Sequence, residues 1–347
     1  MKVAVINNQE IFVEGGAEYL ADSLRDQLVL RGHEATVIRI PFKWYPPSRI
    51  LDHILACRLM KIDPTDVDLV IALKFPAYSI PFANKKVWLL HQFRQAYDLW
   101  GTPFQDIPNT PEGRRVRDMV RVADEAYLPE ALKIYTNSQI VARRLQEYSG
   151  VEANGVLYPP LSEPNPFRSG EFGDYFFYPS RIVPGKRQRL AIEAMRFARP
   201  GLKLVLAGTP VNATHELELR SVVENFNLQE RVRFLGWVSE EEKARWMADA
   251  CGILYLPYDE DSYGFVTLEA FTCHKPVITL ADSGGTKELV THEVTGLVAQ
   301  PSPEAVAEAM NRLWLDRTWA VDLGRNAFGA LNSLEISWDR VVRSLLA

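Results

Sequence analysis

The chain has 347 residues, more than one hydrophobic core usually holds, so two domains are expected. Hydrophobic residues make up 47% of it and charged residues 24%, as in an ordinary globular protein rather than a disordered chain. The net charge of −5 lacks the basic excess of a nucleic-acid-binding protein.

The N-terminal half alternates short apolar strands with helices. The stretch MKVAVINN is predicted to be a strand rather than a signal peptide, and no apolar run approaches the ~18–20 residues of a membrane span. Apolar residues at helical spacing predict a helix from Gly15 that ends at Gly32. The predicted strands are Lys2–Asn7, Glu34–Ile40, Asp68–Leu73, Lys86–Leu90 and Lys133–Ser138. This alternation indicates a parallel sheet that is covered on both faces.

A proline-rich segment, Tyr158–Gly173, is the best candidate for a linker, and a second strand–helix series follows it. Its strands are expected at 174–180, 202–208, 232–236, 252–258 and 276–280, with helices from Arg187, Thr214, Ser239 and Pro303 and a last one in SWDRVVRSLLA. Ser239 and Glu242 form a predicted capping box. We therefore predict an N-terminal domain over 1–162, a C-terminal domain over 163–330, and a C-terminal helix over 331–347 that packs back on the first domain.

Three scattered cysteines, Cys57, Cys251 and Cys273, stand in apolar surroundings and form no CxxC or Cys/His cluster. They are expected to be reduced core residues, which favours a cytoplasmic location and gives no sign of a metal site.

The turn after the first strand does not fit a dinucleotide-binding domain. Such a domain requires GxGxxG there, and an acid about 20 residues further on at the end of the second strand. Here the loop NNQEIFVEGGAEYL carries only Gly15 and Gly16, and the second strand ends in RIPF. An NAD-binding half is therefore not expected.

The segment LYLPYDEDSYGFVTLEAFTCHKPVIT, residues 254–279, joins an apolar strand, three acids, a glycine and a predicted helix. The carboxylates of Asp259, Glu260 and Asp261 are favourable near a helix start, because the free N–H groups there carry partial positive charge. Glu269 stands among apolar residues inside the helix, and a buried carboxylate needs a partner.

The two strand–helix halves, Gly15–Gly16 after the first strand and this segment together resemble the GT-B glycosyltransferases, and more narrowly the retaining family 4 enzymes, the group 1 glycosyl transferases. The resemblance covers nearly the whole chain. The family signature, an acid, seven residues and Glu in a context like E-x-F-G-x-x-x-x-E-A, matches DSYGFVTLEA at Asp261 and Glu269. This sequence differs in using Asp for the first Glu and Tyr263 for the usual Phe.

Further matches extend the resemblance along the chain. PSRIVPGKRQ supplies the family's Arg and Lys five residues apart, as Arg181 and Lys186. The segments SGGTKELVTHEVTGLV (Ser283–Val298), YTNSQIVARRL (Tyr135–Leu145) and VLYPPL also match, in the family's order. The fold that the resemblance implies is α/β, of GT-B type, with two Rossmann-like domains facing across a cleft.

The helix that carries Glu269 is suited to a nucleotide. Gly264 stands where it begins, so neighbouring N–H groups can receive a diphosphate. Glu269 lies roughly 7–8 Å further along, at about 1.5 Å per residue, near the distance from a diphosphate to the ribose hydroxyls. A carboxylate can accept from both hydroxyls of a cis-diol, so the expected partner of Glu269 is a ligand. The alternative is an acid bonded to a neighbouring backbone group or Arg.

By resemblance, Arg181 and Lys186 bind the same diphosphate and meet the charge that builds on it as it leaves. The alternative is that both are solvated residues of a basic loop, which also holds Arg187 and Arg189. Asp261, by resemblance, contacts the donor sugar; otherwise it caps the helix.

Two pairs of acids have the DxD spacing of a metal site, Asp259 with Asp261 and Asp66 with Asp68. The second precedes its strand, at the wrong end of a parallel sheet for a site, and the first lies inside the family motif. Neither is interpreted as a metal site. His274 and His292 are interpreted as surface or packing residues.

His91 closes a predicted strand of the first domain; by resemblance it contacts the transferred sugar or the acceptor, and the alternative is a hydrogen-bonded core histidine. Gly236–Trp237–Val238 matches the position where the family receives the nucleobase, and Trp237 either stacks on the base or covers the core. The other expected nucleotide contacts are Gly15, Gly16, Ser262, Tyr263, Gly264, Phe265 and Val266.

The segment Arg39–Lys61 mixes aromatic and basic residues. Such an amphipathic segment can lie on an anionic membrane surface, and related enzymes often dock lipid-linked acceptors on the first domain. The alternative is an ordinary amphipathic helix with a loop. The expected location is thus cytoplasmic, with peripheral contact to the inner membrane face as an added hypothesis.

The resemblance implies a retaining, metal-independent hexosyltransferase without a cofactor. Its donor would be a UDP- or GDP-sugar, and its acceptor a glycan, a lipid-linked molecule or a small molecule; no nucleic acid partner is expected. Two alternatives stay open. One is a sugar-nucleotide epimerase of the same fold, and the other is a catalytically silent nucleotide-sugar-binding protein, which the Asp at position 261 supports.

Overall fold

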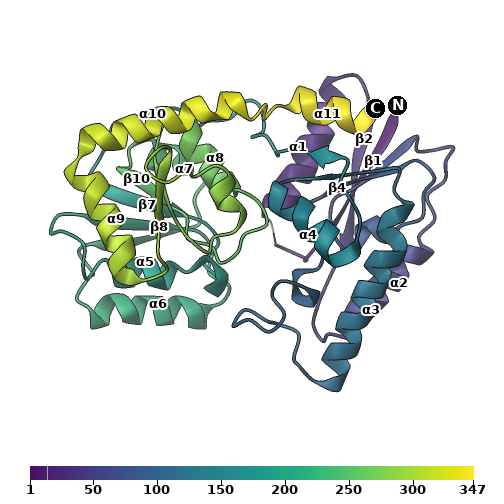
Figure 1. Cartoon of the computed structure of the whole chain (residues 1–347), viewed down its shortest axis with the longest axis horizontal. Helices are drawn as coiled ribbons and strands as arrows, with labels where there is room; N and C mark the ends of the chain where they lie inside the picture. The colour runs from purple at the N-terminus through teal and green to yellow at the C-terminus, as the bar shows by residue number, and fades with distance from the viewer. Residues whose placement is uncertain (14) are drawn as a thin grey trace. The chain divides into compact units, whose positions relative to one another are not determined.

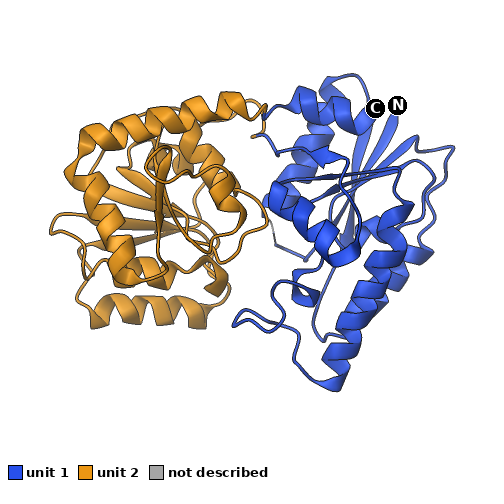
Figure 2. Cartoon of the chain, in the orientation of Figure 1, with its two compact units in different colours: residues 1–160, 336–347 blue, residues 161–335 orange. Residues whose placement is uncertain are grey.

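The computed structural model describes residues 1–13 and 15–347. The chain forms two compact units: unit 1 consists of residues 1–160 and 336–347, and unit 2 of residues 161–335 (Figure 2). The units therefore meet in sequence two residues before the predicted boundary. The second boundary also differs, because residues 331–333 end the last helix of unit 2 instead of opening the C-terminal helix.

Unit 1 is built on a six-stranded parallel sheet with the strand order β2-β1-β3-β4-β5-β6. Its strands are β1 (Lys2–Gln9), β2 (Glu34–Pro41), β3 (Leu69–Ala72), β4 (Lys85–Leu89), β5 (Lys133–Thr136) and β6 (Gly155–Val156). Its helices are α1 (Gly16–Leu30), α2 (Arg49–Leu59), α3 (Pro111–Tyr127), α4 (Gln139–Ser149) and α11 (Trp338–Leu346), with 3-10 turns at Ala77–Ser79, Arg94–Ala96 and Leu128–Glu130.

The C-terminal helix α11 completes unit 1. Its apolar face is buried, and the ring of Trp338 meets that of Trp88 edge-on, with centroids 6.2 Å apart. The Lys86 ammonium donates to the Leu345 carbonyl at 2.9 Å, which satisfies one of the carbonyls that a helix end leaves without a partner. Helix α11 also packs against α1, so residues from the two ends of the chain share one core (Figure 1).

Unit 2 has a second six-stranded parallel sheet, with the order β12-β11-β10-β7-β8-β9. Its strands are β7 (Tyr175–Pro179), β8 (Lys203–Ala207), β9 (Val232–Gly236), β10 (Gly252–Leu254), β11 (Val277–Leu280) and β12 (Gly296–Ala299). Its helices are α5 (Gln188–Ala194), α6 (Ala213–Asn225), α7 (Glu240–Ala248), α8 (Phe265–Thr272), α9 (Pro303–Leu315) and α10 (Arg317–Ser333), with 3-10 turns at Pro184–Lys186 and Gly285–Glu288.

Helices cover both faces of the unit 2 sheet. Helix α5 packs with α6 and α9, whereas α8 packs with α7 and α10, so the unit has three layers (Figure 1). The strands between them are almost wholly buried, as in β10 and β11. Burial on both faces accounts for the continuous apolar strands, which show no alternation.

The strand order reverses once in each sheet. In unit 2 the chain runs outward from β7 through β8 to β9, then returns to the other side of β7 as β10 and continues to β11 and β12. The loops after β7 and β10 therefore leave the sheet in opposite directions, and ligands of open α/β sheets bind at such switch points. In unit 1 the corresponding point lies between β1 and β3.

The predicted elements all occur, with shorter bounds for most strands. The capping box of α7 is confirmed: the Ser239 hydroxyl accepts from the Glu242 backbone N–H, and the Glu242 carboxylate accepts from that of Ser239. The three cysteines are buried and free, as predicted. Among the described residues, no helix is long and apolar enough to cross a bilayer.

Candidate active site

The loops that follow β7 and β10 are tied together at the switch point of unit 2. The Tyr258 backbone N–H donates to the Gly185 carbonyl at 2.8 Å. The Leu256 N–H donates at 3.0 Å to the hydroxyl of Tyr178, which itself donates to the Lys186 carbonyl. These backbone contacts hold the Arg181–Lys186 segment beside the residues that precede α8.

Arg187 strengthens this connection. Its guanidinium donates to the carbonyls of Leu256 and Pro257 at 2.7 and 2.6 Å and forms a two-pronged ion pair with Asp282 at 2.8 Å. Asp282 follows β11, so one side chain links the ends of three neighbouring strands. Arg187 is therefore anchored to the fold, whereas Arg189 is exposed and pairs with Glu193 of its own helix.

The two predicted diphosphate ligands differ in their surroundings. Lys186 is partly buried; its ammonium donates to the Tyr255 hydroxyl at 2.8 Å and pairs with the carboxylate of Glu260. The Tyr255 hydroxyl in turn donates to Glu260 at 3.0 Å. Arg181 is exposed, and within residues 1–13 and 15–347 its guanidinium has no hydrogen bond or ion pair. One cation is thus already paired with an acid, and the other is open to an anion.

The residue before α8 has to be a glycine. Gly264 has a φ of +75°, and a Cβ there would lie 2.3 Å from a ring carbon of Tyr255. The preceding acidic turn is braced by the loop after β11, because the Gly285 N–H donates to the Glu260 carbonyl at 2.8 Å. Asp261 is buried at 7% exposure within this turn. The predicted glycine and Asp261 therefore stand together at the N-terminus of α8.

Glu269 is buried as predicted, but its partner is a residue that the sequence did not reveal. One carboxylate oxygen lies 2.8 Å from the ammonium of Lys243 on α7. The other oxygen is buried and has no hydrogen-bond partner among the described residues. Burial raises the pKa of Glu269, and the charge of Lys243 opposes that rise. One oxygen is thus taken by Lys243, a partner that the sequence analysis did not name, and the expected ligand contact stays a prediction for the second oxygen.

Lys243 lies between two acids. Besides Glu269 it contacts the carboxylate of Glu240, one turn earlier on α7, at 2.8 Å. Burial lowers the pKa of the Lys243 ammonium, but the two carboxylates outweigh it, so that this pKa is raised. The spacing of residues along the sequence does not predict the pair of Lys243 and Glu269, because α7 and α8 come into contact only when the unit folds.

The predicted nucleobase segment lies after β9. Gly236 has a φ of +71°, and Trp237 is 74% exposed, so this ring does not cover the core. Val238 is partly buried just before the cap of α7. The segment thus leads directly into the helix that carries Lys243.

The predicted residue His91 of unit 1 follows β4 and is partly buried. Its Nδ1 lies 2.7 Å from the Gln92 carbonyl, so the proton on Nδ1 is favoured. The Gln92 amide donates to the Asp124 carboxylate at 2.9 Å and to the Ser149 hydroxyl at 2.8 Å. This anchoring sets the position of the loop that carries His91.

Asp124 is fully buried in unit 1 and accepts several hydrogen bonds there. Its carboxylate accepts from the hydroxyls of Tyr78 at 2.6 Å and Tyr97 at 2.9 Å, as well as from the Gln92 amide. Burial raises the pKa of Asp124 to about 6, although the three donors favour the charged form. None of these four residues belongs to a motif that is visible in the sequence.

A second polar cluster lies at the switch point of unit 1. The Gly15 N–H donates to the Glu18 carboxylate at 3.0 Å, and Glu18 also accepts from the Asn7 amide at 3.2 Å and the Lys74 ammonium at 3.0 Å. These groups come from β1, the start of α1 and the end of β3. The predicted residues Gly15 and Gly16 thus lie at the carboxyl edge of the sheet, and residue 14 is outside the described residues.

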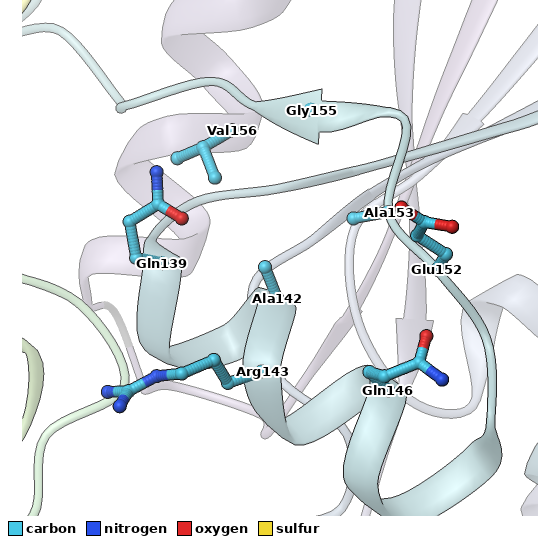
Figure 3. A pocket seen from close by; sticks show the side chains of 8 residues that line it. All are labelled: Gln139, Ala142, Arg143, Gln146, Glu152, Ala153, Gly155 and Val156. Carbon is cyan, nitrogen blue, oxygen red and sulfur yellow. The ribbon is translucent and has the colours of Figure 1, made fainter.

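The amphipathic segment before residue 61 contains α2. Tyr45, Leu55 and Leu59 are exposed, while Phe42 and Trp44 pack against the core. A groove on α4 and β6 of the same unit is lined by polar and small side chains (Figure 3), those of Gln139, Ala142, Arg143, Gln146, Glu152, Ala153, Gly155 and Val156. None of these groove residues belongs to the predicted site.

The acidic pairs that resemble DxD do not form a cluster with further metal ligands. Asp68 precedes β3 and accepts from the Lys2 backbone N–H at 2.7 Å, at the amino edge of the sheet. In the described part of the chain, no group of three or more His, Cys, Asp or Glu side chains could hold a metal ion.

Comparison with known families agrees with this geometry. Residues 163–329, nearly all of unit 2, match the family model "Glycosyl transferases group 1". The segment that contains Arg181, Lys186, Lys243 and the whole of α8 therefore belongs to this family.

Curated relatives match parts of the chain. The mannosyltransferase ALG2 of Mus musculus, described as alpha-1,3/1,6, is 35% identical over 30% of this chain and 24% of its own length. A D-inositol 3-phosphate glycosyltransferase of Pseudarthrobacter chlorophenolicus is 27% identical over 70% of this chain and 64% of its own length. The chain thus spans between about a quarter and two thirds of the length of these curated relatives.

Solved structures resemble the whole chain. Sucrose-phosphate synthase of Thermosynechococcus elongatus superposes with a TM-score of 0.79 over 99% of this chain and 97% of that chain, at 18% identity. HepE of Anabaena, solved with UDP and glucose, has a TM-score of 0.72 over 100% of this chain and 98% of that chain, at 19% identity. At such identities the likeness establishes the fold alone. The predicted GT-B fold is confirmed: each of the two α/β units has a sheet of parallel strands.

Proposed function

We propose that this protein is a glycosyltransferase that moves a hexosyl unit from a nucleoside diphosphate sugar to a hydroxyl-bearing acceptor, with retention at the anomeric carbon. The observation that carries the proposal is the switch point of unit 2. There the loops after β7 and β10 bring Arg181, Lys186 and the N-terminus of α8 together, and Glu269 lies further along the same helix.

These groups suit a nucleoside diphosphate. The positive end of the α8 dipole and the cations of Arg181 and Lys186 receive the diphosphate, since helix N-termini favour anions. The open oxygen of Glu269 accepts from a ribose hydroxyl. The exposed ring of Trp237 offers a stacking surface for the base. Ser262, Tyr263, Phe265 and Val266 complete the proposed nucleotide contacts of unit 2.

Charge stabilisation on the leaving diphosphate supplies the catalysis. When the bond between the anomeric carbon and the phosphate oxygen breaks, negative charge builds on the diphosphate, and Arg181 and Lys186 stabilise it. The acceptor oxygen attacks the same face of the sugar, and its proton passes to the departing phosphate oxygen. Asp261 contacts the transferred sugar, and the contact of His91 with the sugar or the acceptor stays a prediction. Because fixed cations carry this role, the reaction needs no metal ion.

The names of relatives support a nucleotide-sugar donor. One relative from Mycobacterium tuberculosis, 33% identical over 42% of this chain and 39% of its own length, is described as a GDP-mannose-dependent mannosyltransferase. HepE was solved with UDP and glucose. Both UDP- and GDP-sugars are therefore the donors to test, with glycan, lipid-linked and small-molecule acceptors.

The test is a thermal-shift screen of the full chain against UDP- and GDP-sugars, because a ligand of the folded state raises the melting temperature with its concentration. A donor that binds is then incubated with acceptors, with EDTA present. Transfer of the sugar with the donor's anomeric configuration is expected. Binding of no nucleotide sugar would overturn the proposal, isomerisation of the free donor would identify an epimerase, and metal-reversible loss in EDTA would refute metal independence.

A further inference from the structure

Glu269 and Lys243 form a largely buried ion pair in which one oxygen of Glu269 is left open among the residues that the structure describes. The Glu269 side chain is 5% exposed and that of Lys243 is 16% exposed, and their charged atoms lie 2.8 Å apart. The second oxygen of Glu269 is buried without a hydrogen-bond partner among the described residues. A buried carboxylate oxygen in that state is costly unless a ligand satisfies it.

The pair also connects two parts of the proposed nucleotide site. Lys243 is on α7, six residues after Trp237, and α7 begins in a complete capping box that fixes its first turn. Glu269 is on α8, whose N-terminus carries the proposed diphosphate site. The ring of Phe167 lies 5.3 Å from the Lys243 ammonium and covers another side of it. The lysine is thus held from several directions, which makes it a rigid support rather than a mobile surface chain.

From this arrangement we infer that Lys243 is a positioning residue of the ribose subsite: it occupies one oxygen of Glu269, keeps the carboxylate ionised, and directs the other oxygen to a vicinal diol. The inference rests on the proposed nucleotide binding at this unit. On this inference, the site prefers ribose to sugars without the diol because of Lys243, although Lys243 itself contacts no ligand.

Other groups around Glu269 do not replace this role. Glu240 on α7 is a like charge that would raise the pKa of Glu269 if Lys243 were removed. Tyr255 after β10 and Cys273 at the end of α8 also face it, but burial raises the pKa of both well above neutrality, so both are uncharged. Lys243 is therefore the cation that keeps Glu269 ionised among the groups that contact it.

The experiment measures ribose discrimination by titration calorimetry on the full chain. Uridine and guanosine diphosphate are each compared with their 2′,3′-dideoxy counterparts, for wild type and for Lys243→Met and Lys243→Gln. The ratio of the two dissociation constants isolates the diol contact, and the titration of the shared diphosphate cancels in it. Lys203→Met is the matched control, since that lysine forms an exposed ion pair in the same unit.

Wild type is expected to prefer the ribonucleotide by about tenfold or more, the size of one charge-assisted hydrogen bond. Lys243→Met should bring the ratio near one at pH 6.5 and recover part of it as the pH rises, because Glu269 then ionises only at higher pH. A merely structural role would not produce that pH dependence. Lys243→Gln keeps a donor but no charge, and should show the same pH dependence even if Lys243→Met does not fold.

The two possible failures are distinct. If wild type binds neither diphosphate, the proposed function is wrong, and the inference falls with it. If wild type binds and discriminates, but Lys243→Met and Lys243→Gln keep the wild-type ratio at every pH, the inference alone is wrong. A collapsed ratio in Lys203→Met would equally refute a specific role for Lys243.

Discussion

Asp124 in unit 1 and Glu269 in unit 2 are both buried carboxylates, at 0% and 4% exposure, and they are satisfied in different ways. In unit 1, Asp124 accepts from two tyrosine hydroxyls and one amide, so both of its oxygens are in use. In unit 2, Glu269 pairs with Lys243 through one oxygen, and the other is open.

On the proposed function, this is the difference between a structural acid and a binding acid. A carboxylate whose oxygens are saturated by its own fold has no capacity left for a ligand, and its loss leaves buried donors unpaired. A carboxylate with an open, buried oxygen has kept that capacity at some cost in stability, as functional sites often do. Asp124 should therefore matter most for folding, and Glu269 most for binding.

The largest effect is expected at Asp124. Asp124→Ala removes the carboxylate that accepts from the hydroxyls of Tyr78 and Tyr97 and one of the two acceptors of the Gln92 amide, which should lower the free energy of unfolding by about 3–5 kcal/mol. Chemical denaturation measures this. Asp118→Ala, at an exposed position on the same helix, is the control and should change stability by less than about 0.5 kcal/mol. A loss at Asp124 no larger than the control's would contradict the structural role.

Glu269→Ala should reverse the pattern. Nucleoside diphosphate binding should weaken by about 2–4 kcal/mol, since a charge-assisted contact to the ribose is lost. Stability should change little, because Lys243 keeps Glu240 as a partner. Titration calorimetry tests the expected loss of binding, and chemical denaturation tests the expected small change in stability. Glu224→Ala, at an exposed position on α6, is the control for both. An unchanged dissociation constant would remove Glu269 from the site.

The acid of unit 1 should also give a pH signature. Burial raises the pKa of Asp124 from 3.8 to about 6, so the folded state holds more protons than the unfolded state between these values. The free energy of unfolding should therefore fall as the pH rises from 4 to 6, by about 2–3 kcal/mol from this group.

Unfolding of wild type and Asp124→Asn across this range isolates the contribution, because asparagine does not titrate. The stability of wild type relative to the variant should decrease toward pH 6 and then level off. Parallel profiles for the two proteins would show that Asp124 has an ordinary pKa in the folded state.

Substitutions of Arg181 and Lys186 test the proposed diphosphate site of unit 2. Arg181→Ala and Lys186→Ala should each lower kcat by roughly tenfold to a hundredfold, and raise the donor KM less, because their contacts strengthen as the leaving group gains charge. The double variant should lose less than the sum of the two, since both cations address one diphosphate. Arg189→Ala is the control. Wild-type turnover in both single variants would exclude the assignment.

The smallest effect is expected at Glu260. In the ligand-free protein this acid pairs with Lys186, and it would repel an incoming diphosphate. Glu260→Gln should therefore tighten nucleoside diphosphate binding by about 1 kcal/mol, the size of a partly exposed ion pair. Glu193→Gln serves as the control, because Glu193 forms an ion pair with Arg189 on α5. Weaker binding in Glu260→Gln would show that the acid supports Lys186 rather than competing with the ligand.

Most of the fold could be predicted from local patterns. Apolar strands and capped helices predicted most of the elements in both units, but α3 was missed although its buried residues Val116, Val120 and Ala123 recur at helical spacing. Strands β6 and β12 were missed as well, and β6 has only two residues. The last helix was predicted together with its packing on the first domain, and the particular contact between Trp88 and Trp338 became known from the structure.

The sequence by itself determined the residues that act through spacing along one element. Gly264 and Glu269 share a helix, and Arg181 and Lys186 share a loop, so their separation follows from backbone geometry alone. The tertiary structure alone decided the partners that come from different elements. Lys243 and Glu269 are 26 positions apart, and Arg187 and Asp282 are 95 apart. Such pairs form only when the parallel sheet brings helices and strand ends together, because no local periodicity encodes a contact across the fold.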